Sequence, residues 1–268
     1  MSTVATQGSE NAAKPYDQFL LFGDSITEMS YNQALGFAFG AQLQEVYSRR
    51  LDVINRGFGG YTTAHAIQVL PHFFPAPQTA NREVQHCDLT SIDQTIFFGA
   101  NDACVPTHEQ HVPVAVYKEN LQKIIHHPLV RAQDPRIIII TPPPVNEYQL
   151  EDFDNVKETP HPSRTAESAK RYAEAAKEVG ASLNVPVADV WSEFMTAAGW
   201  QEGQALVGSR DVPNSEKFAS LFTDGLHLTP EGYRIVFDEV LKVIRANYPD
   251  QAPEVLSMVF PAWGVAPK

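Results

Sequence analysis

The sequence has few cysteines, few basic residues and no long apolar run. Cys87 and Cys104 are its only cysteines, too few for a disulfide framework or a four-thiolate metal site, and a reducing, cytoplasmic compartment fits best. Its 20 Lys and Arg residues are outnumbered by 32 Asp and Glu residues, and the net charge of −12 disfavours nucleic acid and anionic membranes as partners. No apolar segment approaches the roughly 20 residues of a membrane-spanning helix, so we expect a soluble protein.

The 268 residues, 43% of them hydrophobic, fit one globular domain. Residues 1–15 are rich in small and polar types and lack the basic and apolar regions of a secretory signal, so we expect a flexible N-terminal tail. We place the domain at residues 16–250. Residues 251–268 combine apolar side chains with prolines, and we expect them to form an extended C-terminal strap that buries these side chains against the domain or a second subunit.

Short apolar segments bounded by turn residues recur along the chain and predict strands. They lie at residues 18–22, 51–55, 94–98, 136–141 and 185–188. The fourth contains four consecutive isoleucines, 137–140, without polar alternation, which is typical of a parallel strand covered on both faces.

Helical spacing of apolar residues separates these segments. One helix is expected to carry Leu35, Phe39, Leu43, Val46 and Tyr47, and a second to carry Ala166, Ala169, Tyr172, Ala173, Ala176 and Val179. A final helix is predicted from Thr229 as N-cap and Pro230 at its first position. The alternation predicts an α/β fold: a single three-layer domain with a five-stranded, mostly parallel sheet and helices on both faces.

Ligands of such sheets bind at the carboxyl ends of the strands, where this sequence places several polar and glycine-rich turns. Ser25 follows the first strand and either caps a helix or acts as a nucleophile, which needs a general base. His227 is the best candidate for the base, because Asp224, three residues earlier, can fold back onto its imidazole. The alternative is that Asp224 and His227 form an ordinary surface turn before a helix.

A nucleophilic serine also needs donors for the oxyanion that develops on its substrate. The side-chain amide of Asn101 and the backbone N–H groups of Gly60 and Ser25 are candidates, although Gly60 and Asn101 could equally be turn residues. His108 and His111 have the spacing of metal ligands, but prolines flank them and no further ligand is near in sequence, so no metal is expected.

Four blocks of the sequence together resemble the GDSL (SGNH) hydrolase family over residues 19–245: Gly23-Asp24-Ser25-Ile26, Gly60, Gly99-Ala100-Asn101-Asp102 and Asp224-x-x-His227. The resemblance implies a flavodoxin-like sheet, Ser25 as nucleophile, an Asp224–His227 pair completing the triad, and an oxyanion hole of Ser25, Gly60 and Asn101. Residues 55–61, 140–144 and 224–228 resemble the branch that hydrolyses isoamyl acetate. The stretch 201–213 is an addition to that pattern.

The sequence therefore predicts a serine esterase that hydrolyses short-chain, acetate-type esters through an acyl-enzyme, with no cofactor. Deacetylation of sugars or small glycosides is the nearest alternative, followed by hydrolysis of acyl thioesters or lysophospholipids, and a non-catalytic binding protein is the alternative of another class. Phe260 and Trp263 in the C-terminal strap are expected either to help wall the acyl or alcohol pocket or to form a homodimer contact, or else to brace the fold.

Overall fold

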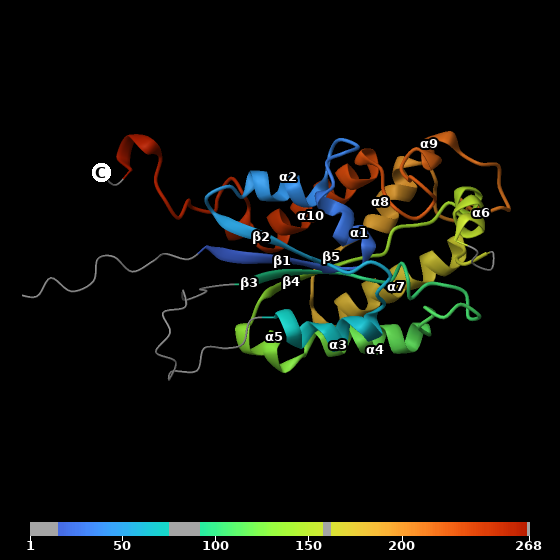
Figure 1. Cartoon of the computed structure of the whole chain (residues 1–268), viewed down its shortest axis with the longest axis horizontal. Helices are drawn as coiled ribbons and strands as arrows, with labels where there is room; N and C mark the ends of the chain where they lie inside the picture. The colour runs from blue at the N-terminus through green and yellow to red at the C-terminus, as the bar shows by residue number, and fades with distance from the viewer. Residues whose placement is uncertain (1–15, 75–91, 158–161, 267–268) are drawn as a thin grey trace, which may run out of the picture.

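The computed structural model describes residues 16–74, 92–157 and 162–266. The expected N-terminal tail, residues 1–15, and Cys87 lie outside the described residues. Figure 1 shows a three-layer arrangement in which one central sheet lies between two layers of helices.

The sheet contains five strands: β1 (Asp17–Gly23), β2 (Leu51–Gly57), β3 (Ile92–Phe97), β4 (Arg136–Ile140) and β5 (Val187–Ala188). Their order is β2-β1-β3-β4-β5 and every pairing between them is parallel. This is the flavodoxin-like order, so the expected fold class is confirmed. Within the described residues, no helix combines the length and apolar character needed to cross a membrane.

Successive side chains of a strand point to opposite faces of the sheet, and this explains how both faces are covered. In β4, Ile138 and Ile140 pack into one hydrophobic core, and Ile137 and Ile139 pack into the other. One face carries α1 (Ser25–Glu28), α2 (Phe39–Val46), α8 (Val190–Ala197) and α10 (Pro230–Asn247), and the other carries α3 (Thr63–Phe73), α4 (Val114–Ile125), α5 (Pro128–Gln133) and α7 (Ala166–Leu183). The uninterrupted isoleucines are thus buried on both sides, as predicted.

Two helices follow their sequence signals and one begins later than expected. Thr229 caps α10 by accepting a hydrogen bond from the Gly232 N–H on its hydroxyl oxygen at 3.3 Å, with Pro230 in the first position. α7 begins at Ala166. Leu35, however, lies outside α2, because Gly36 adopts φ of +127°, which is incompatible with a continuous helix back to Leu35.

The carboxyl ends of the strands are covered by loops and by two short helices, α6 (Glu147–Val156) and α9 (Glu216–Ala219). The added stretch 201–213 runs beside α6, where the Tyr148 hydroxyl donates to the Val212 carbonyl at 2.8 Å. Three 3-10 helices complete the described elements: η1 (Met29–Tyr31), η2 (Pro249–Gln251) and η3 (Trp263–Val265).

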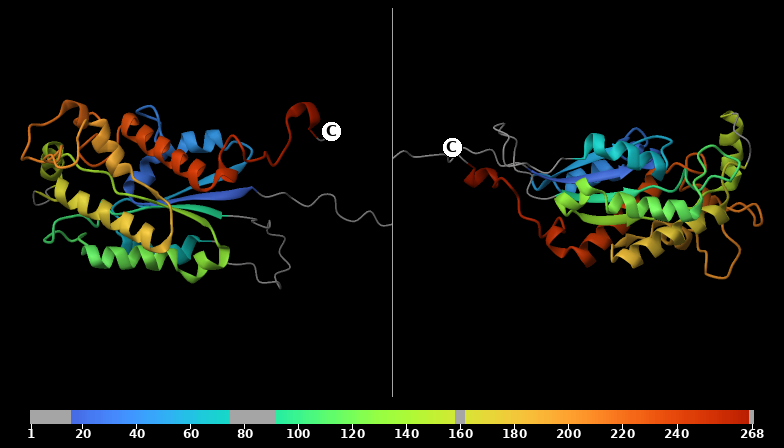
Figure 2. Two further views of the ribbon diagram at one scale, coloured as in Figure 1. Left: turned by 180° about the vertical axis from the view of Figure 1, so that it is seen from behind. Right: turned by 90° about the horizontal axis from the view of Figure 1, so that it is seen from below.

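The C-terminal strap lies at the opposite end of the sheet from these loops (Figures 1 and 2). Phe260 packs edge-on against Tyr16, just before β1, with ring centroids 5.9 Å apart, and the Val259 N–H donates to the Arg49 carbonyl at 2.9 Å. Trp263 is 91% exposed and Phe260 is 42% exposed. The expectation that the strap buries its apolar residues against its own domain is therefore wrong for Trp263 and holds only in part for Phe260, because the segment leaves the sheet by its amino-terminal edge.

Candidate active site

Ser25 is held at the carboxyl end of β1 by the turn that begins α1. Asp24 is the N-cap of this helix, and its carboxylate accepts a hydrogen bond from the Ile26 N–H at 2.9 Å. Because Asp24 caps the helix, the hydroxyl of Ser25, the first residue of α1, is free to contact another partner. That partner is His227, whose Nε2 lies 2.9 Å from Ser25 Oγ although the two residues are 202 positions apart.

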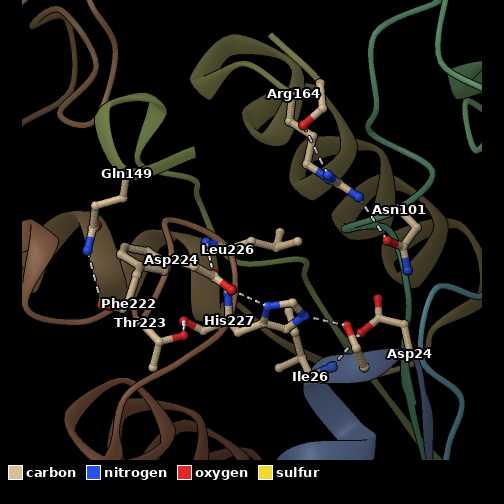
Figure 3. A network of polar contacts seen from close by, with 12 residues as sticks. Asp24, Ile26, Asn101, Gln149, Arg164, Phe222, Thr223, Asp224, Leu226 and His227 are labelled. Atoms are coloured by element: carbon tan, nitrogen blue, oxygen red, sulfur yellow. Dashed lines mark hydrogen bonds and ion pairs between the residues drawn. The ribbon is translucent and has the colours of Figure 1, made fainter. Parts of the chain in front are cut away.

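The turn before α10 fixes His227. Asp224 Oδ1 accepts hydrogen bonds from the Leu226 N–H at 3.0 Å and the His227 N–H at 2.8 Å, while Oδ2 lies 2.7 Å from His227 Nδ1. Gly225 makes this turn possible with φ of +87°, a conformation that a side chain would strain. Asp224, His227 and Ser25 therefore form one continuous chain of polar contacts, and Figure 3 marks the two contacts of His227 as dashed lines on opposite sides of its imidazole.

Electrostatics keep the two carboxyl groups of this region in different states. Burial raises the pKa of Asp224, but hydrogen bonds from His227 and from the two backbone N–H groups, with the charge of His227, more than offset it and hold the pKa below its ordinary value of 3.8. Asp24 is almost completely buried, and this burial raises its pKa from 3.8 to about 7. Asp224 is thus the carboxylate that stays ionised beside the imidazole.

The loops after β2 and β3 bring Gly60 and Asn101 toward the same edge of the sheet. Gly60 has φ of +78°, which favours glycine, and its carbonyl accepts a hydrogen bond from Gln110 Nε2 at 2.7 Å. Asn101 is 3% exposed, and its Nδ2 donates to the Tyr61 carbonyl at 2.9 Å. One Nδ2 hydrogen of Asn101 remains for a further acceptor.

Arg164, which was not identified from the sequence, holds the loop after β3 and reaches Gly60 only through Gln110. The residue is 5% exposed, and its guanidinium donates to the Ala100 carbonyl at 2.7 Å, to Asn101 Oδ1 at 2.9 Å and to Gln110 Oε1 at 3.4 Å. Because Oδ1 faces the guanidinium, Nδ2 of Asn101 must point the other way (Figure 3). No sequence signal marks it, because it is a single arginine in a polar, proline-containing segment.

Other candidate residues are placed away from this chain of contacts. Phe260 and Trp263 lie with the C-terminal strap at the amino-terminal edge of the sheet, so the prediction that they wall the pocket of this protomer is wrong. A homodimer contact through them stays a prediction. His108 and His111 make local contacts instead, to the Gln110 N–H and the Cys104 carbonyl, and the described residues contain no cluster of three or more metal-ligating side chains.

The ring of Phe153, on α6, packs edge-on against the His227 imidazole with centroids 5.9 Å apart, and sequence reasoning did not identify it either. His227 also borders a cavity of about 230 Å³ that opens between residues 29–37 and the start of α10. The site thus combines a serine hydroxyl, an imidazole paired with a carboxylate, amide groups and a largely apolar cavity.

Comparisons with known proteins find relatives over most of the chain. The model of the GDSL-like lipase/acylhydrolase family matches residues 21–235. A GDSL esterase/lipase of Arabidopsis thaliana is 35% identical over 91% of this chain and 91% of its own length. The isoamyl acetate-hydrolyzing esterase of Saccharomyces cerevisiae is 31% identical over 92% of this chain and 94% of its own length.

Solved structures show the same architecture. The lipase/acylhydrolase from Enterococcus faecalis superposes with a TM-score of 0.54 at 26% identity, over 86% of this chain and 96% of that one. The acetyl xylan esterase AlAXEase superposes with a TM-score of 0.61 at 16% identity, over 85% of this chain and 99% of its own, and this likeness concerns the fold alone. On the family match and the identities over most of the chain, the protein belongs to the GDSL-like lipase/acylhydrolase family.

Proposed function

We propose that this protein hydrolyses short-chain carboxylic esters, and acetate esters in particular, through an acyl-enzyme on Ser25. The observation that carries the proposal is the unbroken contact chain from Ser25 Oγ to His227 Nε2, at 2.9 Å, and from His227 Nδ1 to Asp224 Oδ2, at 2.7 Å. A hydroxyl, an imidazole and a carboxylate in this order are the elements of nucleophilic acyl transfer.

In the acylation step, Ser25 Oγ attacks the ester carbonyl carbon while His227 Nε2 takes the hydroxyl proton. The ionised Asp224 carboxylate holds the imidazole in the tautomer that leaves Nε2 free to accept, and it stabilises the imidazolium that forms. The tetrahedral intermediate then collapses as the alcohol oxygen receives the proton from Nε2 and leaves. Water repeats the sequence on the acyl-enzyme and releases the acid.

The oxyanion of the intermediate needs donors that do not rotate when charge develops. We assign this role to Asn101 Nδ2 and to the backbone N–H groups of Gly60 and Ser25. Arg164 and Gln110 support the assignment, because they fix Asn101 Oδ1 and the Gly60 carbonyl on the sides away from the substrate. Donors fixed in this way need no reorganisation in the transition state.

Acetate-type substrates are favoured by the similarity to the isoamyl acetate-hydrolyzing esterase of S. cerevisiae and to its human homolog, which is 30% identical over 92% of this chain. The apolar cavity beside His227 fits an uncharged ester. Sugar deacetylation has no comparable support, because the acetyl xylan esterase shares only the fold.

Labelling and turnover together test the proposal. A fluorophosphonate should add one label, mapped to Ser25 by mass spectrometry, and 4-nitrophenyl acetate should be hydrolysed; Ser25→Ala should abolish both. Ser30→Ala is a matched control, because Ser30 is also buried and its hydroxyl has no hydrogen-bond partner among the described residues. A Ser25→Ala variant that still turned over esters, or an unmutated protein with no activity on any ester, would refute the proposal.

A further inference from the structure

The cavity beside His227 is set apart from the expected oxyanion donors. Its walls include Met29, Asn32, Leu35, Phe37, Tyr233 and His227 itself. Gly60 and Asn101 are not among the described residues that line it. In Figure 3, Asn101 and Asp224 lie on opposite sides of His227. The cavity therefore borders the His227 imidazole and not the expected oxyanion donors.

The chemistry of ester cleavage decides which part of the substrate faces each side. The carbonyl oxygen must point at the oxyanion donors, because negative charge develops on it. The alcohol oxygen must lie within hydrogen-bond reach of His227 Nε2, because this nitrogen gives it the proton with which it leaves. A cavity bordered by His227 and not by the donors is thus on the leaving-group side.

The walls of the cavity indicate what kind of group enters it. Met29 is 41% exposed and Leu35 is 65% exposed, so both present apolar surface to solvent in the free protein. Besides His227, three polar side chains line the cavity, and each is engaged: the Tyr233 hydroxyl donates to the Ile26 carbonyl at 2.8 Å, the Thr223 hydroxyl donates to the His227 carbonyl at 3.2 Å, and Asn32 Oδ1 accepts from the Ala34 N–H at 3.0 Å. Among the described residues lining the cavity there is no Asp, Glu, Lys or Arg.

We propose that this cavity binds the alcohol part of the ester and selects small, uncharged, apolar alcohols. The inference rests on the proposed ester hydrolysis and adds to it the orientation of the substrate and the class of its leaving group. The volume of about 230 Å³ is below the 300–1,000 Å³ typical of sites for drug-sized ligands, so the cavity accepts a short alkyl group and not a long chain. Anionic leaving groups find no cation on its walls.

Two substrate series on the unmutated protein separate the two ends of the ester. In acetate esters of straight-chain alcohols from methanol to decanol, kcat/KM should rise about fourfold per added methylene, the factor expected for burying one CH₂ group, and then level off when the cavity is filled. In ethyl esters of acids of the same lengths, the cavity should produce no such rise.

Variants of the exposed wall residues test the assignment directly. Leu35→Ser and Met29→Ser should each lower the preference for butyl over ethyl acetate at least fourfold, while the ratio of ethyl butyrate to ethyl acetate stays the same. Val116→Ser is the matched control: Val116 is 40% exposed on α4, on the opposite face of the sheet, and its substitution should change neither ratio.

A third measurement needs no variant. When an added alcohol occupies the cavity, it intercepts the acyl-enzyme: its oxygen bonds to the acyl carbon, the bond from that carbon to Ser25 Oγ breaks, and its proton returns through His227 to Ser25 Oγ. With 4-nitrophenyl acetate as donor, the ratio of new acetate ester to acetic acid should therefore increase from ethanol to butanol at equal alcohol concentration.

The outcomes separate this inference from the proposed function. If esters are hydrolysed and Ser25 is labelled, but the wall variants change the acyl series or neither series, the alcohol assignment is overturned while the proposed hydrolysis stands. The alcohol assignment is also overturned if the ratio of new acetate ester to acetic acid is the same for ethanol and butanol. If the unmutated protein hydrolyses no ester, the proposed function fails and this inference fails with it.

Discussion

Removing the Arg164 guanidinium should disable Asn101 without touching the substrate. In Arg164→Met, Asn101 Oδ1 loses the donor that fixes the amide orientation, and Nδ2 is no longer directed toward the position proposed for the oxyanion. Loss of one oxyanion donor lowers kcat by about 10²–10³. Gln110 keeps its hydrogen bond to the Gly60 carbonyl, so the loop after β2 is loosened but stays attached. We therefore expect kcat to fall by up to about 10³-fold, with little change in KM.

The same variant should also destabilise the fold. Asn101 Oδ1 and the Ala100 carbonyl become buried acceptors without a donor, and each such acceptor costs roughly 1–3 kcal/mol. Arg136→Met provides a control for stability alone. Arg136 bonds to Asp93 and Asp250 at the amino-terminal edge of the sheet, so its loss should lower the melting temperature and leave kcat intact.

A double-mutant cycle decides whether Arg164 acts through Asn101. If it does, Arg164→Met combined with Asn101→Ala should lose no more activity than Asn101→Ala alone. Steady-state kinetics on 4-nitrophenyl acetate and the rate of fluorophosphonate labelling should give the same answer, since both reactions develop charge in the same place. Additive losses in the cycle, or an unchanged kcat in the well-folded single variant, would refute the positioning role.

Other expected outcomes follow from the same contacts. Asn101→Ala should lower kcat by about 10²–10³ at nearly constant KM, and a pure KM effect in steady-state assays would mean that Asn101 only binds substrate. Asp224→Asn, which cannot hold the same imidazole tautomer, should lower kcat by about 10⁴ while circular dichroism is unchanged, and a loss below tenfold would contradict the triad. Because burial raises the pKa of Asp24 from 3.8 to about 7, the folded state holds a proton that the unfolded chain has lost, so stability should fall by up to about 4 kcal/mol as the pH rises from 4 to 8. Asp24→Asn keeps the cap acceptor and should flatten this dependence in urea unfolding at pH 5 and 8; an unaltered slope would show that Asp24 is not its source.

The sequence predicts those parts of the molecule that depend on local pattern. The isoleucine run of β4 and the cap at Thr229 are local signals, and both elements formed where they were expected. The contact between Ser25 and His227 was inferred because parallel strands bring their carboxyl ends to one edge, which is a rule of topology rather than of sequence spacing.

The features that could not be predicted depend on side chains that meet only in the folded chain. Arg164 becomes recognisable only when its loop lies against Asn101, because an isolated arginine in a loop carries no signal of burial. The position of the C-terminal strap was predicted wrongly for a related reason. Its apolar composition indicates that it contacts another surface, but composition does not tell which one. The chain leaves α10 at the amino-terminal edge of the sheet.

The separation of 202 positions between Ser25 and His227 has a consequence for how this protein folds. The hydroxyl comes from the turn after the first strand and the imidazole from the loop before the last long helix, so most of the chain lies between them in the sequence. Bringing such distant segments together is slow, since the loop-closure entropy must be overcome before the contact forms. Enzymatic activity should therefore be the last signal to recover in a refolding experiment, after the helical signal in circular dichroism, and a nascent chain that has not yet released α10 from the ribosome should be catalytically silent.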